Sequence, residues 1–275
     1  MIKENIKVAI IDLYNNEKNE GMRCIKEIVT DSGLQFPNAN VTYSVFDARY
    51  KGEIPNLNFD IYISSGGPGD PWDGKGSTWE SSYFRLMDSI ISNNLNSSNK
   101  KKSVFYICHS FQIMSRYFKF ADVTKRPIKS FGILPINRTN QGENDPILRD
   151  LHNPFYAADF RQFQVVNPDY QVLSKLNASI LSTEILPESE NYEPAVMAVR
   201  ISEEIVGTQF HPEADPESML YHFKQPERKS QVTDRYGEAM YNEMIGYIEQ
   251  PDKIKLTRKT VLPTFLNDSI KRILS

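Results

Sequence analysis

The chain has 275 residues, of which 40% are hydrophobic, so it can bury a sizeable core as one large domain or as one domain with an appendage. Its 32 basic and 35 acidic residues give a formal net charge of -3, which argues against nucleic acid or an anionic membrane as partner and favours a small molecule or a protein. No secretion signal opens the sequence, and no stretch approaches the roughly 18 apolar residues of a membrane span, so we expect a cytoplasmic protein without a membrane segment.

The first part of the chain alternates between two apolar patterns. Three continuous apolar runs, typical of strands buried on both faces of a parallel sheet, occupy residues 8–11, 61–63 and 104–107. Apolar residues spaced three to four apart predict helices between these runs, over residues 22–29 and 84–91. This alternation indicates βαβ units, and hence an α/β fold with a mainly parallel central sheet flanked by helices.

Shorter β-rich segments follow, separated by Pro, Asn and Asp turns, and they predict antiparallel additions to the sheet. These segments occupy residues 131–134, 164–166, 196–199 and 204–210. After Pro216 the pattern becomes helical, with a last apolar stripe that Pro263 opens. We therefore predict an α/β domain over residues 1–225 and a helical C-terminal extension over residues 226–275, packed on the domain or on a partner.

Cys108 lies between the predicted strand 104–107 and a helical apolar pattern at residues 113–118, which places it at a strand-to-helix turn. The positive end of a helix dipole lowers the pKa of a thiol there, and the next backbone N–H, of His109, would point toward a developing oxyanion. The alternative is a buried and inert cysteine, which is how we interpret Cys24. Two cysteines are too few for a disulfide framework, and free thiols suit a reducing compartment.

A histidine and a carboxylate follow the last predicted strand. Residues 205–210 predict a strand that leads directly into His211, Pro212 and Glu213. Because residues two apart on extended backbone project to the same side, His211 and Glu213 would face one site. The carboxylate would then hold the tautomer of the imidazole while the other ring nitrogen takes a thiol proton. The alternative is a surface His–Glu pair at a strand end.

A glycine-rich loop, Ser-Gly-Gly-Pro-Gly over residues 65–69, comes directly after the strand at residues 61–63. Consecutive glycines let the backbone approach a ligand closely, so that the N–H groups around Gly66 and Gly67 can stabilise an oxyanion. No Lys-Ser/Thr pair follows in P-loop spacing, which argues against a phosphate site. The alternative is an ordinary Gly-Pro turn.

Taken together, three segments resemble the class I glutamine amidotransferase family: SGGPG at residues 65–69, YICHSFQ at residues 106–112 and GTQFHPE at residues 207–213. Their order and spacing are those of the family, and the resemblance covers about residues 5–225. It implies a flavodoxin-like α/β fold. It also implies that the thiolate of Cys108 attacks the side-chain amide of glutamine, giving a glutamyl thioester and ammonia.

The same resemblance assigns the remaining site residues. His211 and Glu213 would complete a triad with Cys108, and Gly67 and His109 would supply the oxyanion N–H groups. By the resemblance Gln112 would contact the bound glutamine, and we add Gly66 and Arg161 as candidate substrate contacts. Arg161 stands where the family has a Ser-His-x-Asp stretch, here Arg-Gln-Phe-Gln, and it would bind the substrate carboxylate through both guanidinium nitrogens. The alternative is a solvated or a structurally paired arginine.

The elbow also departs from the family, which usually has glycine where Tyr106 and Ser110 stand, so a strained turn would carry side chains. Three functions stay open on this sequence: a glutaminase that passes ammonia to a separate synthetase subunit, a hydrolase of another γ-glutamyl small molecule, and a non-catalytic binding protein. We expect no metal or organic cofactor, because the histidines are scattered and no C-x-x-C pair occurs. The apolar face of the tail leaves a homo-oligomer open.

Overall fold

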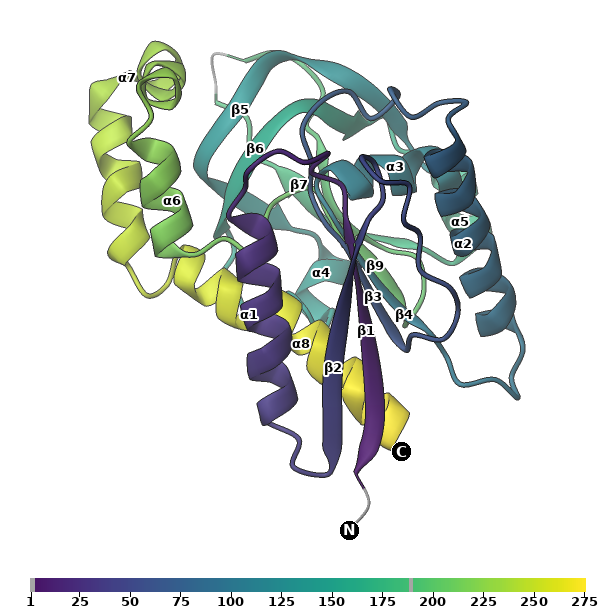
Figure 1. Ribbon diagram of the computed structural model, residues 1–275. Helices are drawn as coiled ribbons and strands as arrows, with labels where there is room; N and C mark the ends of the chain where they lie inside the picture. The colour runs from purple at the N-terminus through teal and green to yellow at the C-terminus, as the bar shows by residue number, and fades with distance from the viewer. Residues whose placement is uncertain (1–2, 188–189) are drawn as a thin grey trace.

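The computed structural model describes residues 3–187 and 190–275, which form one mixed sheet with helices on both faces (Figure 1). Over these residues the sheet has nine strands in the order β2-β1-β3-β4-β9-β8-β7-β5-β6. The strands are β1 (Glu4–Asp12), β2 (Ala39–Asp47), β3 (Ile61–Ser64), β4 (Ser103–Ile107), β5 (Asp122–Arg138), β6 (Phe155–Val166), β7 (Ser179–Glu184), β8 (Val196–Arg200) and β9 (Ile205–Thr208). The helices are α1 (Gly21–Leu34), α2 (Thr78–Leu95), α3 (His109–Phe118), α4 (Asn140–Asn144), α5 (Tyr170–Leu176), α6 (Pro216–Phe223), α7 (Pro226–Glu249) and α8 (Ile254–Leu274).

The parallel half of the sheet brings the predicted site segments to one edge. Strands β2, β1, β3, β4 and β9 run parallel, so their carboxyl ends lie together. The central strands β3, β4 and β9 are buried along their whole length, which explains their continuous apolar sequences. The glycine loop follows β3, Cys108 follows β4, and His211 comes shortly after β9. Ligand sites in open α/β sheets lie at this edge.

The antiparallel half consists of β8, β7, β5 and β6, which extend the sheet beyond β9. Its main feature is the long β5–β6 hairpin, whose register shifts between Lys125 and Ser130. The predicted α/β class, with a parallel centre and antiparallel additions, is therefore confirmed.

Three apolar clusters build the layers around the sheet. One packs α1 and α8 on one face, and a second packs α2, α3 and α5 on the other. The third fills the space between the β5–β6 hairpin and helices α6 and α7, which stand beside that hairpin in Figure 1. From α7 the chain returns through α8, which contacts α1, β1 and β6. No helix within the described ranges combines the length and the apolar character that crossing a bilayer requires.

Several predicted boundaries were wrong. Strand β9 ends at Thr208 rather than at residue 210, and β5 extends on both sides of the predicted 131–134 segment. Pro263 does not open a helix, because it lies inside α8, where burial of Leu262 and Leu266 holds the segment against the core. Helix α7 is interrupted at Gly237, whose φ of 84° and ψ of 164° divide it into two helical pieces.

Candidate active site

Cys108 forms a sharp turn between β4 and α3. Its φ of 48° and ψ of -98° lie outside the regions that residues with a side chain normally adopt, which is the strained geometry of a nucleophile elbow. The backbone N–H of Cys108 donates to the Thr208 carbonyl at 2.7 Å, so the elbow is tied to the end of β9. The thiol lies 3.7 Å from the Phe160 carbonyl and accepts from Gln209 Nε2 at 3.6 Å.

The two elbow positions that depart from the family pattern are accommodated by their neighbours. Ser110 is fully buried, and its Oγ accepts from the Ile107 N–H at 2.8 Å and donates to the Ser64 carbonyl at 2.7 Å. Tyr106 lies beside Gly207 on β9, where a Cβ atom would stand 3.1 Å from the Tyr106 Cβ. The serine thus links β3 to β4, and a glycine on the facing strand makes room for the tyrosine.

His211 and Glu213 meet at the edge of the sheet, as predicted, although β9 ends before them. The His211 N–H donates to the Ala158 carbonyl at 2.9 Å, and its Nδ1 lies 2.8 Å from Glu213 Oε1. This contact leaves Nε2 for the thiol. Burial would lower the pKa of His211, but the adjacent Glu213 carboxylate and Cys108 raise it well above the usual value. The imidazolium form of His211 is therefore favoured.

The glycine loop packs directly against both the histidine and β1. A Cβ atom on Gly66 would lie 2.8 Å from His211 Cε1, and one on Gly67 would lie 2.4 Å from the Leu13 carbonyl oxygen. Both contacts are closer than real Cβ atoms tolerate, so these two positions require glycine. The backbone of the loop can therefore approach the site more closely than a loop with side chains would allow.

One cavity of about 250 Å³ unites the predicted residues. Its wall contains every predicted catalytic, oxyanion and substrate-contact residue except Gly66, which lies behind His211: Gly67, Cys108, His109, Gln112, Arg161, His211 and Glu213. Within residues 3–187 and 190–275, no group of three or more His, Cys, Asp or Glu side chains is arranged to hold a metal ion. The chemistry that this arrangement offers is that of a thiol, an imidazole and a carboxylate.

Gln112 joins the nucleophile to the wall formed by β6. Its Nε2 donates to the Phe163 carbonyl and to Gln209 Oε1, both at 3.2 Å, and Gln209 in turn donates to the thiol of Cys108. Gln209 was missed in the sequence because nothing distinguishes it from the strand residues around it. It lies within the third motif, directly after β9, and this position is the only signal that marks it.

Arg161 lies in the cavity wall, but its guanidinium is largely committed to other groups. Its Nε donates to both carboxylate oxygens of Asp159 at 2.9 Å, and its Nη2 lies 2.7 Å from Glu184 Oε1. The side chain is completely buried, and neither Nη1 nor Nη2 has a hydrogen-bond partner among the described residues, so the contact of Nη2 with Glu184 is ionic. The expectation of a structurally paired arginine is therefore confirmed, and that of a solvated one is wrong, because the side chain is fully buried. Nη1 makes neither a hydrogen bond nor an ion pair among the described residues.

The other histidines near the cavity differ from His211 in charge. Burial, with Arg49 as the next cause, lowers the pKa of His109 to about 3. Burial also lowers the pKa of His222 to about 4, and Arg228 contributes to the shift. Both imidazoles are therefore neutral at neutral pH, whereas the pKa of His211, the histidine beside Cys108, is raised.

Tyr14 and His222 also lie in the cavity wall, and neither was assigned to the site from the sequence. Tyr14 follows β1 at the same carboxyl edge as the other site segments, and this position could have indicated it. Burial, then Glu213 and Cys108, raise the pKa of Tyr14 well above the usual value, so its hydroxyl stays protonated. His222 comes from α6, and the Phe160 ring lies 5.3 Å from both His211 and His222. No local pattern brings α6 to the site.

Solved structures share this fold at low sequence identity. A glutamine amidotransferase from Thermotoga maritima matches with a TM-score of 0.64 and 15% identity, covering 97% of this chain and 98% of its own. A glutamine amidotransferase from Methylobacillus flagellatus matches with a TM-score of 0.54 and 12% identity, over 99% and 93% of the two chains. The glutaminase domain of the Trypanosoma brucei CTPS, solved with bound acivicin, matches with a TM-score of 0.54 and 13% identity, over 83% and 94%.

Sequence comparison places the chain in one family. No curated protein matches it significantly. The model of a family described as glutamine amidotransferase class-I matches residues 21–224, which is well over half of the chain and includes all three motifs. With the elbow, the His–Glu pair and the glycine loop at one edge of the sheet, this match shows that the chain belongs to the class I glutamine amidotransferase family.

Proposed function

We propose that this protein hydrolyses the side-chain amide of glutamine, with Cys108 as nucleophile, His211 as acid and base, and Glu213 as the residue that orients the histidine. The observation that carries this proposal is the meeting of two elements in one cavity. The thiol on a positive-φ turn faces a histidine whose Nδ1 is held at 2.8 Å by a buried carboxylate. This is the arrangement that nucleophilic catalysis by a thiol requires.

The reaction follows from the positions of these groups. His211 Nε2 takes the proton of Cys108, and the thiolate attacks the amide carbon to give a tetrahedral intermediate. The N–H groups of Gly67 and His109 stabilise its oxyanion. The C–N bond breaks as His211 returns the proton to the leaving nitrogen, which departs as ammonia. Water activated by His211 then adds to the thioester, and glutamate leaves as the thiol is reformed.

We assign three residues to the substrate. Gln112 sits between the nucleophile and β6, so it is placed to contact the glutamine backbone. Arg161 supplies its unpaired Nη1 to the substrate carboxylate. Gly66 allows the loop to come close to His211, where the amide must lie. A separate synthetase subunit that receives the ammonia is the partner this reaction would serve.

A second candidate function changes only the leaving group. The cavity extends past His211 to His222 on α6 and Arg228 on α7, which is further than an ammonia leaving group needs. The Ser-His-x-Asp stretch of the family is also replaced, as noted, by Arg-Gln-Phe-Gln at residues 161–164. Both observations favour, as an alternative to glutamine, a γ-glutamyl amide whose leaving amine is larger than ammonia.

Glutamate formation from glutamine and from a panel of γ-glutamyl amides tests both candidates. We expect the wild-type protein to release glutamate, and Cys108→Ser to lose about 10⁵-fold or more in kcat because the thiolate is removed. Cys24→Ser is the matched control, since Cys24 on α1 also lines the cavity but burial raises its pKa to about 12, which disfavours its thiolate, and it should retain activity. Activity on γ-glutamyl amides without activity on glutamine would favour the second candidate. Equal rates for wild type and Cys108→Ser would contradict both.

A further inference from the structure

The helical extension, residues 226–275, lies beyond the region that matches the family, yet two of its arginines reach elements of the site. We infer that this extension positions the active site, through Arg258 of α8 at the triad and Arg235 of α7 at the cavity wall. Helices α7 and α8, which lie outside the three motifs, thus hold residues of the site in position. Its kinetic test rests on the proposed function, and a second test does not.

Arg258 fixes the turn that carries Glu213. Its Nη1 donates to the backbone carbonyl of Glu213, and its Nη2 pairs with Glu27 Oε2 on α1 at 2.9 Å. The Glu213 carboxylate touches His211 through Oε1, while Oε2 has no hydrogen-bond partner in the described part of the chain. With no second side-chain contact to align it, the carboxylate depends on its backbone for position. Arg258 therefore acts on the tautomer of His211 through Glu213.

Arg235 connects the extension to the cavity wall through Lys129, which lines the cavity. Its Nε and Nη2 each donate to Glu190 at 2.8 Å, and its Nη1 donates to the Lys129 carbonyl at 2.9 Å. The Tyr192 hydroxyl contacts Glu190 and lies 3.2 Å from Arg235 and 3.0 Å from Arg126. One helix of the extension thus holds both the 190–192 segment and the β5 bulge.

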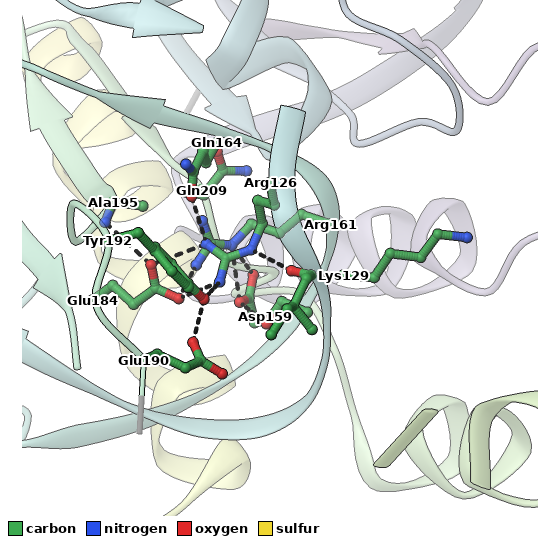
Figure 2. Close-up of polar contacts among 12 residues, drawn as sticks. Arg126, Lys129, Asp159, Arg161, Gln164, Glu184, Glu190, Tyr192, Ala195 and Gln209 are labelled. Atoms are coloured by element: carbon green, nitrogen blue, oxygen red, sulfur yellow. Dashed lines mark hydrogen bonds and ion pairs between the residues drawn. The ribbon is translucent and has the colours of Figure 1, made fainter. Parts of the chain in front are cut away.

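The connection continues through a buried set of charges that Figure 2 shows around Glu184. Arg126 pairs with Glu184 and donates to Gln164 at 2.9 Å, while Arg161 pairs with Glu184 and Asp159. The ionic network consists of three arginines and three carboxylates, each with a side chain no more than 8% exposed: Arg126, Arg161, Arg235, Asp159, Glu184 and Glu190. Its charges balance, so each member depends on the others.

Strand β6 connects the ionic network to the site, because it contacts both. Its side chains at Asp159, Arg161 and Gln164 belong to the ionic network or bond to it. The carbonyls of Phe160 and Phe163, on the same strand, contact the Cys108 thiol and Gln112. Removing Arg235 would leave Glu190 buried without its cation and would loosen the wall against which the substrate is bound. We therefore expect Arg235 to act on substrate binding and Arg258 to act on the chemical step.

The Arg258 arm compares two arginines of α8. Arg258→Gln should lower kcat about 10- to 100-fold, because a small displacement of the triad is costly, while KM stays close to wild type. Arg258→Lys keeps a cation and a donor and should recover part of the loss. Arg272→Gln is the matched control, since Arg272 contacts Glu203 and Ser103 at the far end of the helix, and it should behave as wild type.

The Arg235 arm compares two cations of α7. Arg235→Gln should raise KM for glutamine about 10-fold with a smaller change in kcat. The reason is that strand β6 in the cavity wall would shift, while Cys108, His211 and Glu213 would stay in place. If Arg235→Gln proves too unstable to measure, the double variant Arg235→Gln/Glu190→Gln removes both charges, should fold, and should show the same rise in KM. Lys229→Gln breaks an exposed pair with Glu238 and a cation–π contact with Tyr241, neither of which belongs to the ionic network, and it should leave KM unchanged. Wild-type kinetics for correctly folded Arg258→Gln and Arg235→Gln, judged by thermal unfolding, would overturn the inference.

A readout without substrate separates this inference from the proposed function. If the wild-type protein hydrolyses no γ-glutamyl amide, the proposed function fails, but the rate of Cys108 alkylation by iodoacetamide at pH 7, mapped by mass, still reports how His211 is held. Burial raises the pKa of Cys24 to about 12, so Cys24 should react slowly. Arg258→Gln should slow alkylation of Cys108, whereas Arg272→Gln should not. Equal rates for these two variants would overturn the role of Arg258.

Discussion

The two halves of the sheet hold their functional groups in different ways. At the parallel half, the elbow, the glycine loop and the His–Glu pair each follow a strand, and each is shaped by the backbone within a few residues. At the antiparallel half, the ionic network joins side chains from β5, β6, β7, α7 and the 190–192 segment. In the first arrangement, the strand before each group places it, and contacts with neighbouring strands then fix it. In the second, no single strand places the charges, because they come from segments more than 100 residues apart.

The two halves of the sheet differ in what their polar groups can do. Groups at the parallel edge can take part in bond making, because the cavity opens onto Cys108, His211 and Glu213. The charges of the ionic network are buried and paired with one another, so they hold backbone in place rather than react. Changes at the parallel edge should therefore alter rate most, and changes in the ionic network should alter stability and its dependence on pH.

The largest expected effect at the parallel edge, beside loss of the nucleophile, comes from Glu213→Gln. An amide in place of the carboxylate can donate to Nδ1 and hold His211 in the wrong tautomer, so kcat should fall about 10⁴-fold. Steady-state release of glutamate measures it. Glu217→Gln, an exposed carboxylate in the first turn of α6, is the matched control and should retain activity. A loss of less than 10-fold in Glu213→Gln would mean that the carboxylate does not orient the base.

The next effect tests the ionic network. Burial would raise the pKa of Glu184, but Arg161 and Arg126 outweigh it and lower the pKa from 4.5 to about 2. A group whose pKa is lowered on folding contributes stability above its unfolded pKa and loses it as pH falls through the folded pKa. The shift corresponds to about 3 kcal/mol at neutral pH, of which about 2 kcal/mol should be gone at pH 3.

Urea unfolding of Glu184→Gln at several pH values checks this contribution. The difference in unfolding free energy between wild type and Glu184→Gln should shrink as pH falls from 5 to 3, because the wild type alone loses the ionised group. Glu203→Gln is the control, since Glu203 is 78% exposed in its pair with Arg272, and its difference from wild type should stay flat. A difference for Glu184→Gln that is independent of pH would show that the carboxylate is not ionised in the network.

The contrast also explains what could be predicted from sequence. Cys108, His211 and Glu213 were found because a turn or a strand end determines where each side chain points, and the order of the motifs links them. The ionic network was not found, because Arg126, Glu184 and the other members share no spacing and meet only when β5, β6 and α7 are folded together. Arg161 was named, but its pairing with Glu184 depends on that same folding. For the same reason the sequence did not predict that α6 brings His222 to the cavity.

Ser110→Ala is the smallest expected effect, and it asks whether the elbow depends on side chains as well as on backbone. The hydroxyl of Ser110 connects the Ile107 N–H to the Ser64 carbonyl, so its loss leaves two buried backbone groups short of a partner. The free energy of unfolding should fall by about 1–3 kcal/mol, measured by urea titration. Ser81→Ala, which removes an exposed hydroxyl from the first turn of α2, should cost less than about 0.5 kcal/mol.

If the two variants lose the same amount of unfolding free energy, the backbone alone holds the elbow, and the serine at the usual glycine position is only tolerated. If Ser110→Ala loses more, β3 and β4 are joined at the nucleophile by a side chain, and the parallel edge shares with the antiparallel half a dependence on contacts between distant segments.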